Sequence, residues 1–249
     1  MRLLIAIPVH NEFKYVHQVL DKVLRYHGDV LVIDDGSTDG TSDLLRSRSD
    51  VRVIRHPVNR GYGQSLVDAF KYADVHGYDW VITMDCDEQH EPEMIPRFIE
   101  EIEKGGADVI SGSRYLEARP EADLPPGDRR MINASITATL NELFGWKLTD
   151  AFCGFKAHRV EAMRRLCLDE PGYAFPMQLW PQVWRQGLVV RELAVSLIYN
   201  DPNRSFGVVL DDPSVRLKHY LDVLGREMRR PMTAPRIASE AICSCGCTD

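Results

Sequence analysis

Two carboxylates and an amide follow a short apolar run in the first half of the chain. Asp85, Asp87 and Gln89 alternate along the segment after residues 80–83. In extended backbone alternate side chains point the same way, so these three can converge on one point. Carboxylate and amide oxygens suit Mg²⁺ or Mn²⁺ and leave room for water and phosphate oxygens. The spacing predicts a cation site beside a nucleotide diphosphate, with a solvated acidic loop as the alternative.

Two other polar clusters also follow apolar runs. Residues 3–9 end at His10 and Glu12, and residues 30–33 run into the acidic pair that includes Asp35. Both runs are too short to span a membrane and are typical of buried parallel strands. Open α/β sheets bind ligands at the carboxyl ends of their strands, so we expect these clusters to meet at one site. A turn and helix cap would also explain the cluster at Asp35.

A glycine-containing loop follows a third strand, predicted over residues 51–54. Gly61 and Gly63 stand in this loop, before a helix that we expect to begin near Ser65. Glycine lets the backbone approach a ligand closely, and the helix N-terminus favours anions.

Composition favours a single globular domain and disfavours a nucleic-acid-binding or membrane-spanning protein. A chain of 249 residues with 44% apolar content can bury one sizeable core. The net charge of −7 disfavours a broad nucleic-acid surface, and no apolar run reaches transmembrane length. Cys86, Cys153 and Cys167 are scattered along the chain, which suits a reducing compartment, and we expect a cytoplasmic location.

Periodicity continues the alternation of strands and helices. We expect an α/β fold: a mostly parallel sheet flanked by helices, forming a single domain over residues 1–210. A C-terminal helix and tail follow over residues 211–249. Residues 117–128 lack apolar periodicity and are predicted to form a mobile loop. Apolar spacing predicts further helices within 16–24, 95–102, 132–144, 160–166 and 175–184, a strand at 107–112, and an antiparallel or edge strand within 189–199.

The C-terminal segment has an apolar stripe surrounded by arginine and lysine over residues 213–230. Such a helix either packs on its own domain or lies on an anionic membrane surface. The cysteines at the end of the chain lack the partner ligands of a closed zinc site, and we expect a disordered tail there. These are Cys243, Cys245 and Cys247.

Taken in order, these motifs resemble the family 2 inverting glycosyltransferases, which have the Rossmann-like GT-A fold. They are most similar to the polyprenyl-phosphate (dolichol-phosphate-type) mannosyl- and glucosyltransferases. The resemblance implies metal-dependent transfer of a hexose from a nucleotide diphosphate sugar, of the GDP-mannose or UDP-glucose type, to a polyprenyl phosphate. The matching segments are residues 8–12, 32–41, 59–63, 84–90, 112–115 and 149–156.

The resemblance also implies a donor site. Pro8, His10 and Glu12 would line the nucleoside pocket together with Gly61. A carboxylate at Asp35 would accept the ring N–H of uracil or the corresponding donors of guanine.

The predicted cation would act on the leaving group. Departure of a nucleoside diphosphate builds negative charge, which Mg²⁺ or Mn²⁺ held by Asp85, Asp87 and Gln89 would stabilise. Asp87 is therefore also a candidate catalytic residue.

Two acceptors stay open. Arg114, Arg129, Arg130 and Arg204 suggest recognition of a phosphate, because the guanidinium group matches phosphate geometry. The resemblance implies that this is the phosphate of the lipid acceptor. The chain lacks the serine and lysine that this branch tends to carry after its last strand. A saccharide hydroxyl is the alternative acceptor, and it would need a base, for which Asp150 is the candidate. With a lipid acceptor, the protein would contact the cytoplasmic face of a membrane peripherally.

Other classes are also conceivable from the sequence. A sugar-nucleotide pyrophosphorylase would carry a glycine-rich basic loop after its first strand, where this chain has His10 and Glu12. A non-catalytic nucleotide-sugar binding protein remains open, since a fold alone does not establish turnover.

Overall fold

The computed structural model of the protein describes residues 1–117, 127–196, 198 and 209–231. Arg204 and the three tail cysteines lie outside these ranges, as does most of the predicted loop over 117–128. The end of that loop is helical, because helix α5 begins at Gly127.

The described residues form one seven-stranded sheet with the strand order β3-β2-β1-β4-β6-β5-β7. All neighbouring strands are parallel except β6, which is antiparallel to both β4 and β5. This arrangement confirms the predicted mostly parallel α/β fold. The strands are β1 (Leu3–Val9), β2 (Val30–Asp34), β3 (Arg52–Arg55), β4 (Trp80–Thr83), β5 (Val109–Ser113), β6 (Lys156–Arg159) and β7 (Val190–Ala194).

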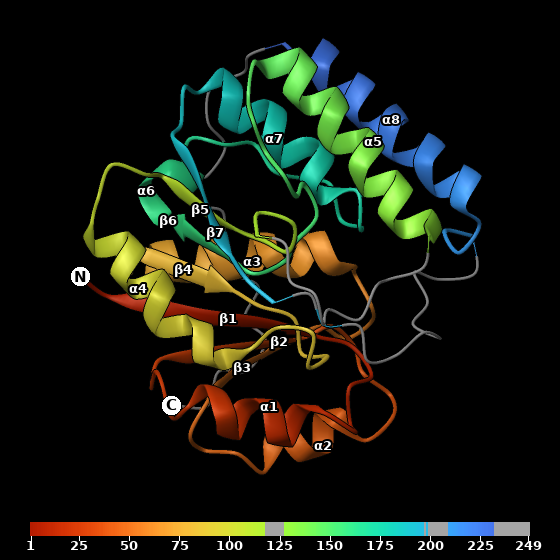
Figure 1. Ribbon diagram of the computed structural model, residues 1–249. Helices are drawn as coiled ribbons and strands as arrows, with labels where there is room; N and C mark the ends of the chain where they lie inside the picture. Colours follow the sequence, from red (N-terminus) through yellow and green to blue (C-terminus); the bar gives the residue numbers. More distant parts are fainter. Residues whose placement is uncertain (118–126, 197, 199–208, 232–249) are drawn as a thin grey trace.

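Helices cover both faces of the sheet (Figure 1). Helix α5 lies beside α8, which packs on α7, while α1 and α2 lie on the opposite side of the sheet in this view. The helices are α1 (Val16–Val23), α2 (Thr41–Arg46), α3 (Tyr62–Val75), α4 (Ile95–Glu103), α5 (Gly127–Phe144), α6 (Val160–Met163), α7 (Phe175–Arg185) and α8 (Pro213–Arg229), with a short 3-10 turn, η1 (Pro92–Met94).

Because side chains alternate along each strand, the strands contribute to two hydrophobic cores, one on each face of the sheet. Ile5 and Ile7 of β1 point into the core that contains α1 and α4. Leu4 and Ala6 point into the core that contains α3, α5 and α7. Because successive strand residues face opposite sides, a strand buried on both faces is apolar throughout, as β1 is.

Four local features of the structure differ from the sequence analysis. Strand β6 was not predicted, because its sequence Lys156-Ala157-His158-Arg159 is polar, yet its first three residues are buried. Helix α2 was also missed, and α3 begins at Tyr62 rather than near Ser65. Strand β7 is an edge strand as expected, but it pairs parallel to β5.

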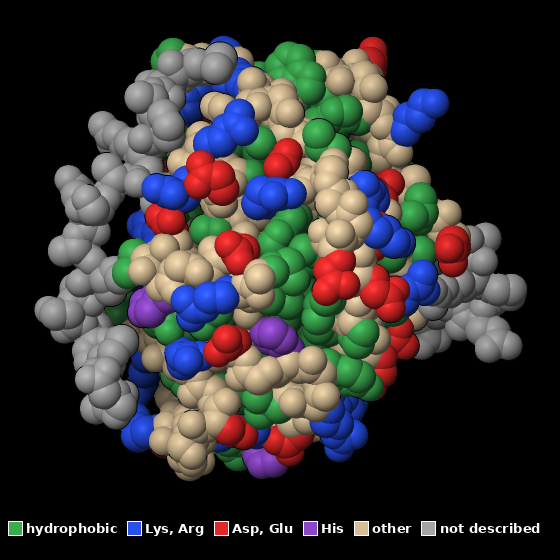
Figure 2. Space-filling model, turned by 90° about the vertical axis from the view of Figure 1, so that its left-hand side faces the viewer, with side chains coloured by type: hydrophobic (Ala, Val, Ile, Leu, Met, Phe, Trp, Pro, Cys, Tyr) green, Lys and Arg blue, Asp and Glu red, His purple; other side chains and the backbone are tan. Residues whose placement is uncertain are grey.

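An ion pair joins the edge strand β7 to helix α4. Arg191 of β7 forms an ion pair with Glu101 of α4 at 3.2 Å and donates to the carbonyl of Gly105 at 3.1 Å. Figure 2 views the side on which α4 lies and shows acidic and basic side chains interspersed there. Charges at a sheet edge discourage pairing with another chain.

Helix α8 packs on its own domain, against α5 and α7. Tyr220 and Leu224 of the predicted stripe are buried, whereas Leu221 is 43% exposed. Arg216, which the sequence placed on the polar face, is buried instead and pairs with Asp128 of α5 at 2.6 Å. Within the described ranges, no helix combines the length and the apolar character that crossing a membrane requires.

Candidate active site

A cavity of about 570 Å³ opens where β1, β2, β4 and β5 end at the same edge of the sheet. Its walls come from the loops after these strands, the start of α3, and helices α5 and α8. The converging strand ends thus bring together motifs that are far apart in the sequence. The predicted site residues that line it are Pro8, His10, Glu12, Asp35, Gly61, Asp85, Asp87, Gln89, Arg114 and Arg129.

Three predicted residues do not line this cavity in the described structure. Arg130 is exposed at the start of α5, whereas its neighbour Arg129 faces the cavity. Asp150 is fully buried beneath the wall. Arg204 lies outside the described residues.

At the β2 end of the cavity, Asp35 is held by three hydrogen bonds. Its Oδ1 accepts from the Nδ1 of His56 at 2.6 Å and from the backbone N–H of Arg60 at 2.7 Å. Its Oδ2 accepts from the backbone N–H of Gly61 at 2.8 Å. Burial alone would raise the pKa of Asp35, but these hydrogen bonds outweigh it and lower the pKa, so the group is ionised.

His56 is a residue that sequence reasoning missed. It is buried, and its Nε2 lies 3.0 Å from Oδ2 of Asp68 on α3 while its Nδ1 binds Asp35. Hydrogen bonds to the two carboxylates raise the pKa of His56 to about 9. A lone histidine before the glycine loop has no distinguishing pattern in the sequence, because both partners come from other elements.

The glycines of the loop are required by the protein's own packing. Gly61 has a φ of +101°, and a Cβ there would lie 2.3 Å from the carbonyl oxygen of Pro171. A Cβ on Gly63 would lie 2.2 Å from the carbonyl oxygen of Glu170. The sequence explained these glycines by close approach to a ligand, but the structure adds a contact with a loop more than 100 residues away.

His10 has a defined orientation on the wall. Its Nδ1 lies 2.8 Å from the carbonyl oxygen of Asp35 and must donate there. Its Nε2 then accepts from the side-chain amide of Asn11 at 3.2 Å. The bond to Asp35 connects the loops after β1 and β2, which the sequence placed in one pocket.

The segment after β4 presents the predicted cation ligands. Asp85 Oδ1 is buried and has no hydrogen-bond partner among the described residues, although the Tyr62 hydroxyl bonds to the Asp85 carboxylate. The backbone N–H of Asp85 donates to Nδ1 of His90 at 2.9 Å, which helps to fix the segment. Asp87 is also buried, and its Oδ1 accepts from the N–H of Gln89 at 3.0 Å.

These residues fit a divalent cation. A buried carboxylate oxygen without a partner carries a desolvation penalty that a bound ion would offset. In the described part of the chain the buried Nε2 of Gln89 has no partner, and rotation of the amide would turn its oxygen to the same position. Within the described residues no group of three or more His, Cys, Asp or Glu side chains could hold a metal alone. Ligand oxygens would therefore have to complete the coordination of an ion here.

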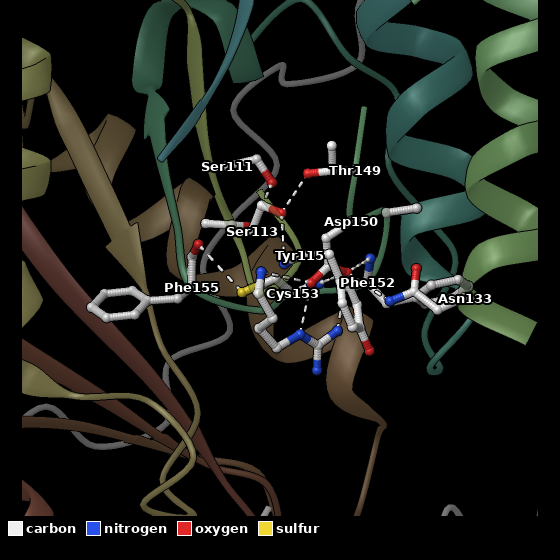
Figure 3. A network of polar contacts seen from close by, with 12 residues as sticks. Ser111, Ser113, Tyr115, Asn133, Thr149, Asp150, Phe152, Cys153 and Phe155 are labelled. Atoms are coloured by element: carbon white, nitrogen blue, oxygen red, sulfur yellow. Dashed lines mark hydrogen bonds and ion pairs between the residues drawn. The ribbon is translucent and has the colours of Figure 1, made fainter. Parts of the chain in front are cut away.

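At the other end of the cavity, Asp150 organises a polar network (Figure 3). Arg114 binds it side-on, with Nε to Oδ2 at 2.7 Å and Nη2 to Oδ1 at 3.0 Å. Asn133 of α5 donates to Oδ1 at 2.9 Å, and the backbone N–H groups of Phe152 and Cys153 donate as well. Burial would raise the pKa of Asp150, but the charge and hydrogen bonds of Arg114 lower it to about 2.

Aromatic residues complete the wall and were not predicted. Tyr62 stacks on Tyr173 with ring centroids 5.8 Å apart, and Phe152 packs on Tyr220 at 5.0 Å. All four line the cavity. Tyr220 comes from α8, whose apolar spacing predicted a buried stripe but gave no indication of a role at the site.

Comparison with known proteins identifies the family. The family model described as glycosyl transferase family 2 matches residues 4–167, about two thirds of the chain. The chain belongs to glycosyl transferase family 2. The resemblance stated from the sequence is confirmed, and the protein is a glycosyltransferase.

Curated relatives cover most of the chain. The undecaprenyl-phosphate mannosyltransferase of Micrococcus luteus is 29% identical over 82% of this chain and 87% of its own. The polyprenol monophosphomannose synthase of Mycolicibacterium smegmatis is 29% identical over 78% of this chain and 77% of its own.

Solved structures confirm the fold. Glucosyl-3-phosphoglycerate synthase from Mycobacterium tuberculosis, in complex with UDP, aligns with a TM-score of 0.71 at 20% identity, covering 92% of this chain and 81% of that one. The same enzyme has been crystallised with Mg²⁺ and UDP, and with Mn²⁺ and UDP-glucose. At this identity the likeness bears on the fold alone.

Proposed function

We propose that the protein transfers a hexose, with inversion, from a nucleotide diphosphate sugar to a polyprenyl phosphate and depends on a divalent cation. One observation carries this proposal: an arginine clamped by a buried carboxylate lines the same cavity as the ionised Asp35 and the Asp85–Asp87 pair. The cavity thus has an anionic end and a cationic end. The relatives named for undecaprenyl phosphate and polyprenol support the same acceptor.

The anionic end would bind the donor. Asp35 accepts an N–H of the base, while Pro8, His10 and Glu12 line the nucleoside pocket with Gly61. Asp85, Asp87 and Gln89 would hold Mg²⁺ or Mn²⁺. When bound, the cation neutralises charge that develops on the departing diphosphate.

The cationic end would bind the acceptor phosphate. Asp150 occupies the Nε and Nη2 side of Arg114, which leaves the Nη1 side of the guanidinium toward the cavity. Arg129 lines the same cavity from α5. Two guanidinium groups can bind one phosphate through charge-assisted hydrogen bonds. We retain Arg204 as a third candidate and remove Arg130, which is exposed.

The prediction of Asp150 as a general base is revised. A base must reach the proton it removes and must have a pKa near the working pH. Asp150 has no exposed surface, accepts from Arg114, Asn133 and two backbone N–H groups, and has a pKa of about 2. We therefore assign it to holding Arg114 in place. An ionised lipid phosphate needs no base, which favours it over a saccharide hydroxyl.

A lipid acceptor requires contact with a membrane. Beside the cavity, α5 and α8 expose apolar side chains, including Met131, Val215 and Leu221. Lys218 and Arg229 accompany them on α8. We propose that this pair of helices approaches the cytoplasmic face of a membrane peripherally.

The test is transfer of radiolabelled sugar into the lipid phase. The full chain is incubated with polyprenyl phosphate and GDP-mannose, UDP-glucose or UDP-N-acetylglucosamine, with Mn²⁺ or with EDTA. We expect one donor to label the lipid and EDTA to abolish labelling. Labelling of a soluble saccharide added in a parallel incubation, with none in the lipid phase, would overturn the acceptor assignment. Donor binding without transfer to the lipid or hydrolysis would overturn the proposed reaction.

A further inference from the structure

Most hydrogen-bond acceptor positions of the Asp35 carboxylate are used by the protein itself. A carboxylate offers about four acceptor positions, two on each oxygen. Both positions on Oδ1 are occupied, by the Nδ1 of His56 and the backbone N–H of Arg60. One position on Oδ2 is occupied by the backbone N–H of Gly61. Among the described residues, Oδ2 therefore has fewer donors than Oδ1 and is the oxygen more available to a molecule in the cavity.

His56 must be a donor on both sides. Its Nδ1 faces Asp35 and its Nε2 faces Asp68, at 2.6 and 3.0 Å. Because an ionised carboxylate only accepts, both ring nitrogens carry protons. Asp68 thus keeps His56 oriented toward Asp35, and neither His56 nor Asp68 lines the cavity within the described residues.

The common bases differ in the hydrogen-bond donors that they can present to the Asp35 carboxylate. The Watson–Crick edge of uracil has one N–H, at N3, between two carbonyl oxygens. Guanine has two adjacent donors, N1–H and the N2 amino group, which pair best with both oxygens of one carboxylate. Cytosine and adenine present a ring nitrogen that only accepts, and it would face the carboxylate lone pairs unfavourably.

We propose that His56, by occupying Oδ1 of Asp35, makes the nucleoside site selective for uracil, so that the donor is a UDP-sugar. The inference rests on the proposed function, since it names the donor class of that enzyme. Asn59 lines the same cavity, and its amide can donate to a uracil carbonyl. Guanine would place one of its donors opposite an oxygen that already accepts two hydrogen bonds. An unmet buried donor weakens binding roughly tenfold or more.

Calorimetry of the full chain with nucleotides and Mn²⁺ tests this selectivity. We expect UDP to bind at least about tenfold more tightly than GDP, CDP or ADP. The diphosphate of N3-methyluridine, which lacks the single N–H, should bind about tenfold more weakly than UDP. GDP binding as tightly as UDP, or equal binding of the methylated nucleotide, would overturn the proposal.

Two variants test whether the preference for UDP depends on His56 itself. His56→Ala exposes one position on Oδ1, so the preference for UDP over GDP should fall severalfold. Asp68→Asn still accepts from Nε2 and should keep the preference. An unchanged preference in folded His56→Ala would refute the role of His56, and the nucleotide series on the unmodified chain remains decisive if that variant does not fold.

Nucleotide binding is measured without acceptor, which keeps the two proposals apart. A preference for UDP with no transfer to polyprenyl phosphate would reject the acceptor and retain this inference. Transfer to the lipid from a GDP-sugar alone would retain the acceptor and reject the inference of a UDP-sugar donor.

Discussion

Arg114 and Asp150, separated by 36 residues, form a side-on pair with N–O distances of 2.7 and 3.0 Å. The carboxylate has no exposed surface, whereas the arginine reaches the cavity. A buried anion can fix a cation in one orientation toward a ligand, and this pair is the basis of the acceptor site that we propose.

The first prediction concerns Asp150→Asn. The variant keeps the shape but removes the charge that balances Arg114, so the guanidinium should lose its fixed orientation. We expect affinity for the acceptor phosphate to fall roughly ten- to a hundredfold while donor hydrolysis persists, as measured by initial rates with varied acceptor.

Arg114→Lys is the matched variant, since lysine keeps the charge but cannot bind side-on. It should show a similar loss. A complete loss of rate in Asp150→Asn, with Arg114→Lys nearly unaffected, would restore the role of Asp150 as base.

The second prediction is that Asp87→Ala abolishes transfer without unfolding the protein. Asp87 is one of two buried carboxylates proposed to hold the cation at the strand end. Retention of more than about a tenth of the rate, a loss below about 1.4 kcal/mol of barrier, would remove the cation role. Glu88→Ala is the control, because Glu88 pairs with Lys22 at 3.1 Å and is not among the residues that line the cavity.

The third prediction compares adjacent arginines on α5. Arg129 lines the cavity and Arg130 is exposed. Arg129→Ala should weaken acceptor binding roughly tenfold through the loss of one charge-assisted contact, whereas Arg130→Ala should change it little. Titration with a short-chain polyprenyl phosphate measures both. Equal effects would mean that the acceptor site is placed wrongly.

The fourth prediction concerns the pH dependence of stability. The folded pKa of His56 is about 9, raised from 6.5 by its hydrogen bonds to Asp35 and Asp68. At a pH between these two pKa values, the folded protein binds one more proton than the unfolded chain does. The stabilisation is complete below pH 6.5 and is lost as the pH rises through 9, with a slope of about 1.4 kcal/mol per pH unit.

Urea denaturation at several pH values measures this slope. His56→Gln should flatten the curve over that interval, whereas His76→Gln, at an exposed histidine after α3, should not. Parallel curves for the protein and His56→Gln would contradict the assigned ion pairs.

The sequence by itself determined the fold class, the family and the donor motifs. Apolar runs and helical spacing are local patterns, and Asp85 and Asp87 stand two residues apart on one segment. Their convergence at the carboxyl edge follows from the general geometry of parallel sheets. The strands β1, β2 and β4 were therefore predictable, whereas the polar strand β6 was not, because burial between two neighbours decides its structure.

Only the tertiary structure decided which groups meet around those motifs. The contact of His56 with Asp35 spans 21 residues, and that of Arg114 with Asp150 spans 36. Tyr220 reaches the cavity from a helix near the end of the chain. Hydrogen-bond partners and burial set the protonation of each carboxylate, and both depend on packing between distant segments. For this reason the sequence offered Asp150 as a base, whereas its burial and its lowered pKa are the grounds on which we propose a positioning role.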